Sequence, residues 1–141
     1  MINNLKIKNF KAIKDETFIF KNLTILAGTN SSGKSSTIQA LLLCSLEINR
    51  EYNSALANYL SFLRRDKISL LNFNVGARDF IIEIDEMAQL SYKKSERSFD
   101  IKNSSSELAH SISYQNGNLI YLCADRIGTR EFYAKNDNPD I

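Results

Sequence analysis

The chain has 141 residues, of which 43% are hydrophobic and 24% charged, with a single proline. This length suits one domain with a buried core, and the composition excludes a disordered, collagen-like or disulfide-dense chain. The 18 basic and 16 acidic side chains leave a formal charge of +2, which alone makes no electrostatic case for a nucleic-acid partner. The apolar run Ala40–Cys44 is far shorter than the roughly 20 residues of a membrane span, and lysines interrupt Met1–Lys14 where a signal peptide would be apolar. We therefore expect a cytoplasmic protein with no membrane partner.

The first third of the chain predicts strands followed by a helix. Apolar and polar residues alternate from Asn4 to Phe20, which predicts two antiparallel strands joined by a turn. The short run Leu23–Ala27 is apolar on both faces, as is typical of a strand buried in a parallel sheet, and it ends at Gly28. From Lys34 to about Asn49, apolar residues recur at helical spacing without glycine or proline, which predicts a deeply buried helix.

The middle of the chain begins with a second helical pattern, from about Tyr52 to Leu63, and Arg64-Arg65 suits its last turn. Beyond Ile68 the period changes to that of strands, and a polar loop lies at Asn103–Ser106. Three short segments predict strands paired as hairpins: Phe80–Ile84, Gln89–Tyr92 and Ser98–Ile101.

The turn dipeptide Asn116-Gly117 is the next structural signal. Its residues readily adopt positive φ angles, so it predicts a tight hairpin between Ile112–Gln115 and Asn118–Leu122. The tail Lys135–Ile141 shows no periodicity.

The segment Gly28–Ser35 fits the phosphate-binding pattern of glycine, four residues, and then Gly-Lys-Ser. Gly28 and Gly33 let the backbone wrap a phosphate and present its N–H groups. Lys34 supplies an ammonium to the β- and γ-phosphates, and the Ser35 hydroxyl is suited to ligate Mg²⁺. The predicted nucleotide-binding residues are Gly28, Thr29, Asn30, Ser31, Ser32, Gly33, Lys34, Ser35 and Ser36.

Hydrolysis also requires a carboxylate at the end of a second strand. One candidate is Asp85-Glu86 after Ile81–Ile84, although Glu83 would place a charge within a strand buried on both faces. The other is Asp125 at the end of Leu119–Ala124, where Arg126 follows instead of a second acid, so that a structural or partner-contacting ion pair is the competing interpretation. Both alternatives stay open.

The cysteine and histidine side chains indicate no further chemistry. Cys44 and Cys123 lie in or beside apolar runs without metal-ligand spacing, and we expect buried free thiols. His110 is the sole histidine and lies in a polar stretch, where we expect a structural or exposed role.

The opening Leu5–Lys11, the segment Asn22–Ser36 and the leucine-rich helix after it resemble the start of ABC-type ATPase heads. The likeness is to the overcoming-lysogenization-defect, RecF and SMC branch, and within it to the AAA-family ATPases of anti-phage systems such as Septu and some retrons. The segment Tyr121–Gly128 also looks like one found in those ATPases.

This resemblance implies an α/β P-loop NTPase fold: a central sheet, a helix after the P-loop at 28–35, and an antiparallel β layer. Residues 1–141 would be the N-terminal lobe, with a β-rich insertion at 64–118 and the second half of the head absent. It also implies ATP and Mg²⁺ as ligands, and Lys11 near the base and ribose. An exposed lysine at the end of a strand is the competing interpretation of Lys11. In the complete protein the resemblance implies hydrolysis, a homodimer or larger oligomer, and a nuclease or nucleic-acid partner.

Two alternatives of other classes remain. A regulatory module that binds nucleotide without hydrolysing it would share the same loop, because the loop defines phosphate binding and not turnover. A compact kinase or GTPase would require a base-specificity segment or lid, and we find neither in the sequence.

Overall fold

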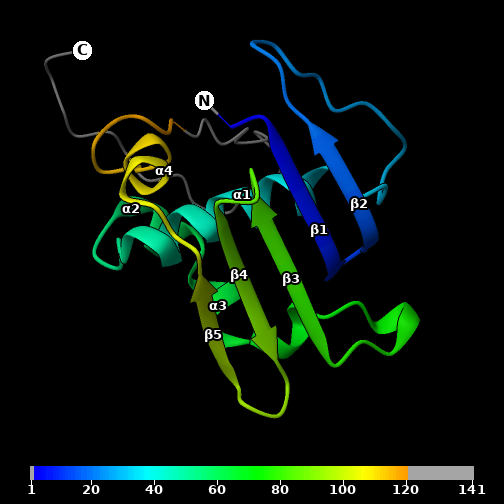
Figure 1. The fold of residues 1–141 in the computed structure, drawn as a ribbon. Coiled ribbons are helices and arrows are strands. Elements are labelled where there is room, and N and C mark those ends of the chain that lie inside the picture. Colours follow the sequence, from blue (N-terminus) through cyan, green and yellow to red (C-terminus); the bar gives the residue numbers. More distant parts are fainter. Residues whose placement is uncertain (1, 121–141) are drawn as a thin grey trace, which may run out of the picture.

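The structure, a computed structural model, describes residues 2–120. Its centre is a five-stranded sheet in which every neighbouring pair is antiparallel, with the order β2-β1-β3-β4-β5 (Figure 1). The strands are β1 (Asn4–Phe10), β2 (Ile13–Ile19), β3 (Asp79–Ile84), β4 (Ala88–Lys93) and β5 (Ser98–Lys102).

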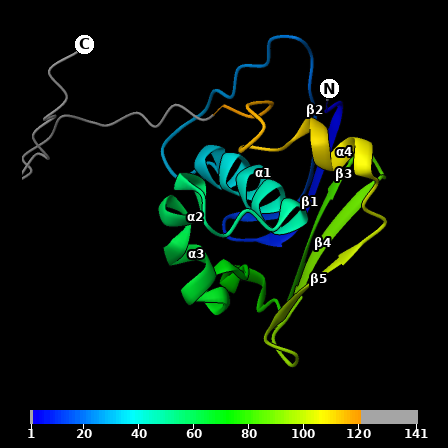
Figure 2. The same ribbon diagram turned by 90° about the vertical axis from the view of Figure 1, so that its left-hand side faces the viewer.

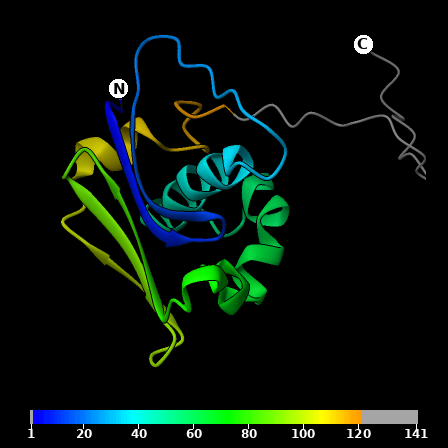
Figure 3. The ribbon, with the colours of Figure 1, turned by 90° about the vertical axis from the view of Figure 1, so that its right-hand side faces the viewer.

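Helices cover one face of this sheet, as Figures 2 and 3 show from its two sides. The long helix α1 lies across the inner face, and the short helices follow it in the chain. The helices are α1 (Lys34–Asn49), α2 (Ala55–Tyr59), α3 (Ser61–Arg65) and α4 (Ser106–Ser111), with 3₁₀ turns η1 (Lys67–Leu70) and η2 (Phe73–Val75).

The core lies between α1 and the inner face of the sheet. Alternation along the strands puts Leu5, Phe80 and Tyr92 inside, and the lysines of β1 outside. Phe80 makes an edge contact with Phe10 at 5.1 Å between ring centroids and stacks on Tyr92 at 5.7 Å. Such aromatic pairs stabilise a core beyond their buried area.

Several expected elements are confirmed. The antiparallel pair within Asn4–Phe20 forms β1 and β2, and the helix after Gly33 runs from Lys34 to Asn49 as expected. The three strands expected between residues 80 and 101 pair as successive antiparallel neighbours. The chain is thus a mixed α/β domain.

The expected buried strand at Leu23–Ala27 is wrong for this structure. These residues form an irregular segment, and Leu23 and Ile25 are 79% and 78% exposed. A strand that is apolar on both faces needs a neighbouring strand and a covering layer. No strand among residues 2–120 pairs with this segment, so the central parallel sheet is not seen in the described part of the chain.

Two further expectations need correction. A single helix is expected over Tyr52–Leu63, but the structure has two short helices there. Helix α2 begins only after the Ser54 cap, and the helical path breaks at Leu60 before α3. The hairpin expected around Asn116-Gly117 is absent from the described residues, where α4 is followed by turns. The buried Glu51 carboxylate accepts hydrogen bonds from the Ser113 hydroxyl and the Gln115 N–H, and this holds the segment in a turn.

Candidate nucleotide-binding site

A hollow of about 360 Å³ lies where the turn between β1 and β2 meets the start of α1. The turn contributes Lys11 and Ala12, and the segment before and within the first turn of α1 contributes Asn30–Ser36. Seven of the nine residues expected to bind nucleotide therefore line a single hollow, and Gly28 and Thr29 lie directly before them in the chain.

Two glycines with positive φ shape the loop. Gly28 has φ +152°, and a Cβ there would lie 2.8 Å from the Ser32 hydroxyl oxygen. Gly33 has φ +94°, and a Cβ there would lie 3.3 Å from Cγ1 of Ile13. Gly33 thus allows the loop to turn into α1 while it packs closely on β2.

The N-terminus of α1 opens onto the hollow. Gly33 is its N-cap, so that no side chain caps the helix. Within residues 2–120, the N–H groups of Lys34, Ser35 and Ser36 donate to no acceptor, as is usual for the first turn of a helix. These donors and the helix dipole favour an anion at this place.

The Lys34 side chain folds back over the loop. Its ammonium donates to the carbonyl oxygens of Gly28 and Thr29, at 2.8 and 2.6 Å, and to the Ser32 hydroxyl at 3.3 Å. The loop thereby encloses a positive charge that is held by neutral acceptors alone. A phosphate would offer this ammonium a stronger, charged acceptor.

Lys11 is the second cation of the hollow. Its ammonium donates to Oε1 of Gln39 on α1 at 2.7 Å and lies 5.9 Å from the centre of the Phe62 ring. Partial burial lowers the pKa of the Lys11 ammonium. Two amino groups therefore approach the hollow from different elements.

The acidic candidates lie elsewhere or outside the described residues. Asp85 is in the turn after β3, where its carboxylate accepts from the backbone N–H groups of Asn3 and Asn4 at 2.9 and 2.6 Å. Glu83 is half-buried on the outer face of the sheet, so the assumption that its strand is covered on both faces is wrong. Asp125 and Arg126 lie outside the described residues, as does Cys123.

No group of three or more His, Cys, Asp or Glu side chains suited to a metal ion occurs among residues 2–120. The exposed Ser35 side chain borders the hollow and has no hydrogen-bond partner in the same range. Its hydroxyl therefore fits one oxygen position of a Mg²⁺ whose other ligands are phosphate oxygens and water.

The two remaining reactive side chains, Cys44 and His110, do not line the hollow. Cys44 is a buried free thiol, as expected, and burial together with the nearby Glu47 raises its pKa. His110 lies exposed on α4, with its Nδ1 3.3 Å from the Asn116 amide nitrogen. Among residues 2–120, every helix is too short or too polar to span a bilayer.

Sequence reasoning missed three residues around the hollow: Ile13, Gln39 and Phe62. Ile13 packs under Gly33, while Gln39 and Phe62 contact Lys11. The sequence pattern assigns each of them only to its own strand or helix. Their meeting depends on how α1 and α3 pack beside the β1–β2 turn, which local patterns do not encode.

These features define a mixed α/β domain with a phosphate-loop sequence at the start of helix α1. The family model described as "AAA ATPase domain" matches residues 1–136. The chain therefore belongs to the AAA ATPase domain family.

Part of the chain is also similar to a curated protein. It is 47% identical over 45 residues to the DNA replication and repair protein RecF of Acetivibrio thermocellus. The match covers 31% of this chain and 12% of that protein, so the chain spans only a small part of that relative. No solved structure matches the chain significantly.

Proposed function

We propose that this chain binds ATP together with Mg²⁺ at the hollow beside α1. One observation carries the proposal: the phosphate-loop residues, the open N-terminus of α1 and the Lys34 ammonium converge on a space of about 360 Å³. The backbone N–H groups of Gly33–Ser36 would hold the phosphates, and Thr29, Asn30, Ser31 and Ser32 would shape and line the loop.

Each cation has a separate role in this proposal. The Lys34 ammonium would exchange the carbonyl oxygens of Gly28 and Thr29 for the β- and γ-phosphate oxygens. The Ser35 hydroxyl would ligate Mg²⁺, which supplies positive charge to the same oxygens. Lys11, which lines the hollow from the turn between β1 and β2, would contact the base or ribose.

We further propose that the complete protein hydrolyses ATP as an ABC-type head of the overcoming-lysogenization-defect, RecF and SMC branch. Membership of the AAA ATPase domain family and the partial similarity to RecF support this assignment. Nucleic acid, alone or through a nuclease subunit, is the proposed target, and a dimer or larger oligomer the proposed active form. Residues 1–141 would act as the first lobe, with residues 64–118 as its β-rich insertion. In support, β3, β4 and β5 lie within residues 64–118 and extend the sheet of β1.

Isothermal titration of the chain with Mg-ATP tests the binding proposal. The wild-type chain should bind, and Lys34→Ala should lose most of the heat and affinity. Lys14→Ala is the matched control, because Lys14 is an exposed lysine of β2 outside the hollow and should leave binding unchanged. Equal binding by the wild type and Lys34→Ala would overturn the proposal.

A nucleotide-binding module without hydrolysis is the second candidate. The Asp85 carboxylate accepts hydrogen bonds from the N–H groups of Asn3 and Asn4. This favours the second candidate, since the same carboxylate is then not free to hold the water shell of a metal. Under this candidate the chain binds Mg-ATP with negligible turnover. Turnover that Asp125→Asn or Asp85→Asn abolishes would exclude it and identify the metal-site carboxylate.

A further inference from the structure

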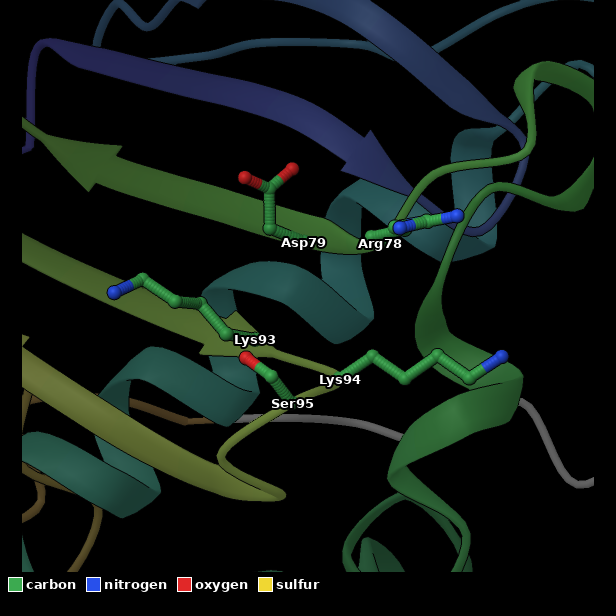
Figure 4. A pocket seen from close by; sticks show the side chains of 5 residues that line it. All are labelled: Arg78, Asp79, Lys93, Lys94 and Ser95. Atoms are coloured by element: carbon green, nitrogen blue, oxygen red, sulfur yellow. The ribbon is translucent and has the colours of Figure 1, made fainter.

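A second hollow, of about 570 Å³, lies at the end of β3 and β4 away from the N-terminus of the chain. It is lined by Arg78, Asp79, Lys93, Lys94 and Ser95 (Figure 4). Figure 4 shows the Arg78 and Lys94 side chains extending toward the same side, while Lys93 and the Asp79 carboxylate point elsewhere.

The positive charges of this hollow are only partly neutralised. Lys93 forms an ion pair with Glu96 at 2.9 Å, and Asp79 accepts a hydrogen bond from the Asn9 amide at 3.4 Å. Within residues 2–120, the side chains of Arg78 and Lys94 have no ion pair or hydrogen-bond partner. Two cations therefore remain available on one side of the hollow.

The backbone fixes the spacing of these two cations. The N–H of Lys94 donates to the carbonyl oxygen of Arg78 at 2.8 Å, directly beyond the last β3–β4 pair, Asp79 and Lys93. The turn that follows is closed by the Arg97 N–H, which donates to the Lys93 carbonyl oxygen at 2.9 Å. The Arg78 and Lys94 side chains thus leave from neighbouring points of an ordered sheet end.

The chemistry of the lining suits a phosphate ligand. All five lining residues are charged or polar, and Figure 4 shows the carboxylate of Asp79, the acidic member, pointing in another direction than Arg78 and Lys94. A guanidinium, an ammonium and the Ser95 hydroxyl are together suited to the oxygens of a phosphodiester.

We propose that this hollow binds the sugar–phosphate backbone of DNA, with Arg78 and Lys94 as the contacts to phosphate. The inference rests on the nucleic-acid part of the proposed function and assigns that role to a place on this chain. Because the contacts are to phosphate, binding is independent of base sequence and weakens as salt rises.

The test is fluorescence anisotropy of a labelled DNA duplex titrated with the chain at several salt concentrations. The double variant Arg78→Gln/Lys94→Gln should bind roughly tenfold or more weakly at 0.1 M salt, and its salt slope should fall by about 1.8, as expected for the loss of two phosphate contacts. The control Lys14→Gln/Lys21→Gln removes the same charge from exposed lysines elsewhere and should change both values little.

The inference would be overturned if the wild-type chain did not bind DNA, or if both double variants lost the same affinity for DNA. It would also be overturned if poly-glutamate displaced the labelled DNA as strongly as unlabelled DNA does, because this would indicate an acidic protein ligand. Titration with Mg-ATP separates this failure from that of the nucleotide site. A chain that binds Mg-ATP but not DNA retains the proposed nucleotide site and loses only the present assignment.

Discussion

The ammonium of Lys34 lies 2.6 Å from the carbonyl oxygen of Thr29, so the loop and its lysine hold each other in place. If phosphate replaces this acceptor, the Gly28 and Thr29 carbonyls are released while the N–H groups at the start of α1 gain acceptors. We expect Mg-ATP to slow amide hydrogen exchange across 30–37, as measured by mass spectrometry. Lys34→Ala should show no such protection, and slowing of equal size in this variant would contradict the proposed role of the lysine.

Gly33→Ala should be the more damaging of two matched glycine substitutions. Gly33 and Gly76 both have positive φ, at +94° and +62°, which costs a non-glycine residue about 1–2 kcal/mol. At Gly76 nothing lies within 4 Å of the added Cβ, whereas at Gly33 it would meet Ile13 at 3.3 Å. Urea denaturation should therefore show a larger loss in the free energy of unfolding for Gly33→Ala, and calorimetry should show weakened Mg-ATP binding for that variant alone. If Gly33→Ala and Gly76→Ala lost the same free energy of unfolding, the Ile13 side chain would move aside from the added Cβ without an energetic cost.

Lys11→Met should lower the affinity for Mg-ATP by about tenfold, the size of one hydrogen bond from a charged donor of roughly 1.5 kcal/mol. Methionine keeps a long unbranched side chain and removes the ammonium, which lies 5.9 Å from the centre of the Phe62 ring and belongs to a residue that lines the hollow. Lys8→Met on the exposed outer face of β1 is the control and should bind as the wild type does. An unchanged affinity for Lys11→Met would remove Lys11 from the site.

The same pair of variants gives a prediction about pH. Burial lowers the pKa of Lys11 in the folded chain, so the unfolded chain binds more protons as pH approaches the ordinary lysine value of about 10.4. The wild type should therefore gain stability relative to Lys11→Met as pH rises through the range just below that value. Denaturation midpoints at pH 8 to 10 measure this, and a constant difference would show that burial does not perturb Lys11.

The elements that sequence reasoning placed correctly are those with strong local signals. Helix α1 begins at Lys34 because the glycine before it ends the loop, and β1 to β5 follow from alternating side chains over short spans. The phosphate-loop residues gather at one hollow because their order in the chain already brings them together.

The errors concern segments whose structure depends on distant partners. Glu51 holds the turn after α4 through the Ser113 hydroxyl, and this contact overrides the hairpin preference of Asn116-Gly117. Glu47, buried against Arg64 at 2.9 Å and the Tyr52 hydroxyl at 3.0 Å, ties α1 to the two segments that follow it. Buried carboxylates of this kind leave no periodic signal in a sequence.

The segment Leu23–Ala27 offers the last prediction, which concerns self-association. Leu23 and Ile25 expose 79% and 78% of their surface, and an apolar groove of about 470 Å³ lined by Leu26, Ile38 and Leu41 lies beside them. Exposed apolar surface of this kind promotes association in water. Light scattering of the isolated chain should therefore show concentration-dependent oligomers, and Leu23→Gln/Ile25→Gln should shift it toward monomer without lowering its unfolding midpoint. Phe73→Gln, a change at a 68% exposed residue of η2, is the control and should associate as the wild type does. Monomers at all concentrations in the wild type would show that this surface is covered in solution.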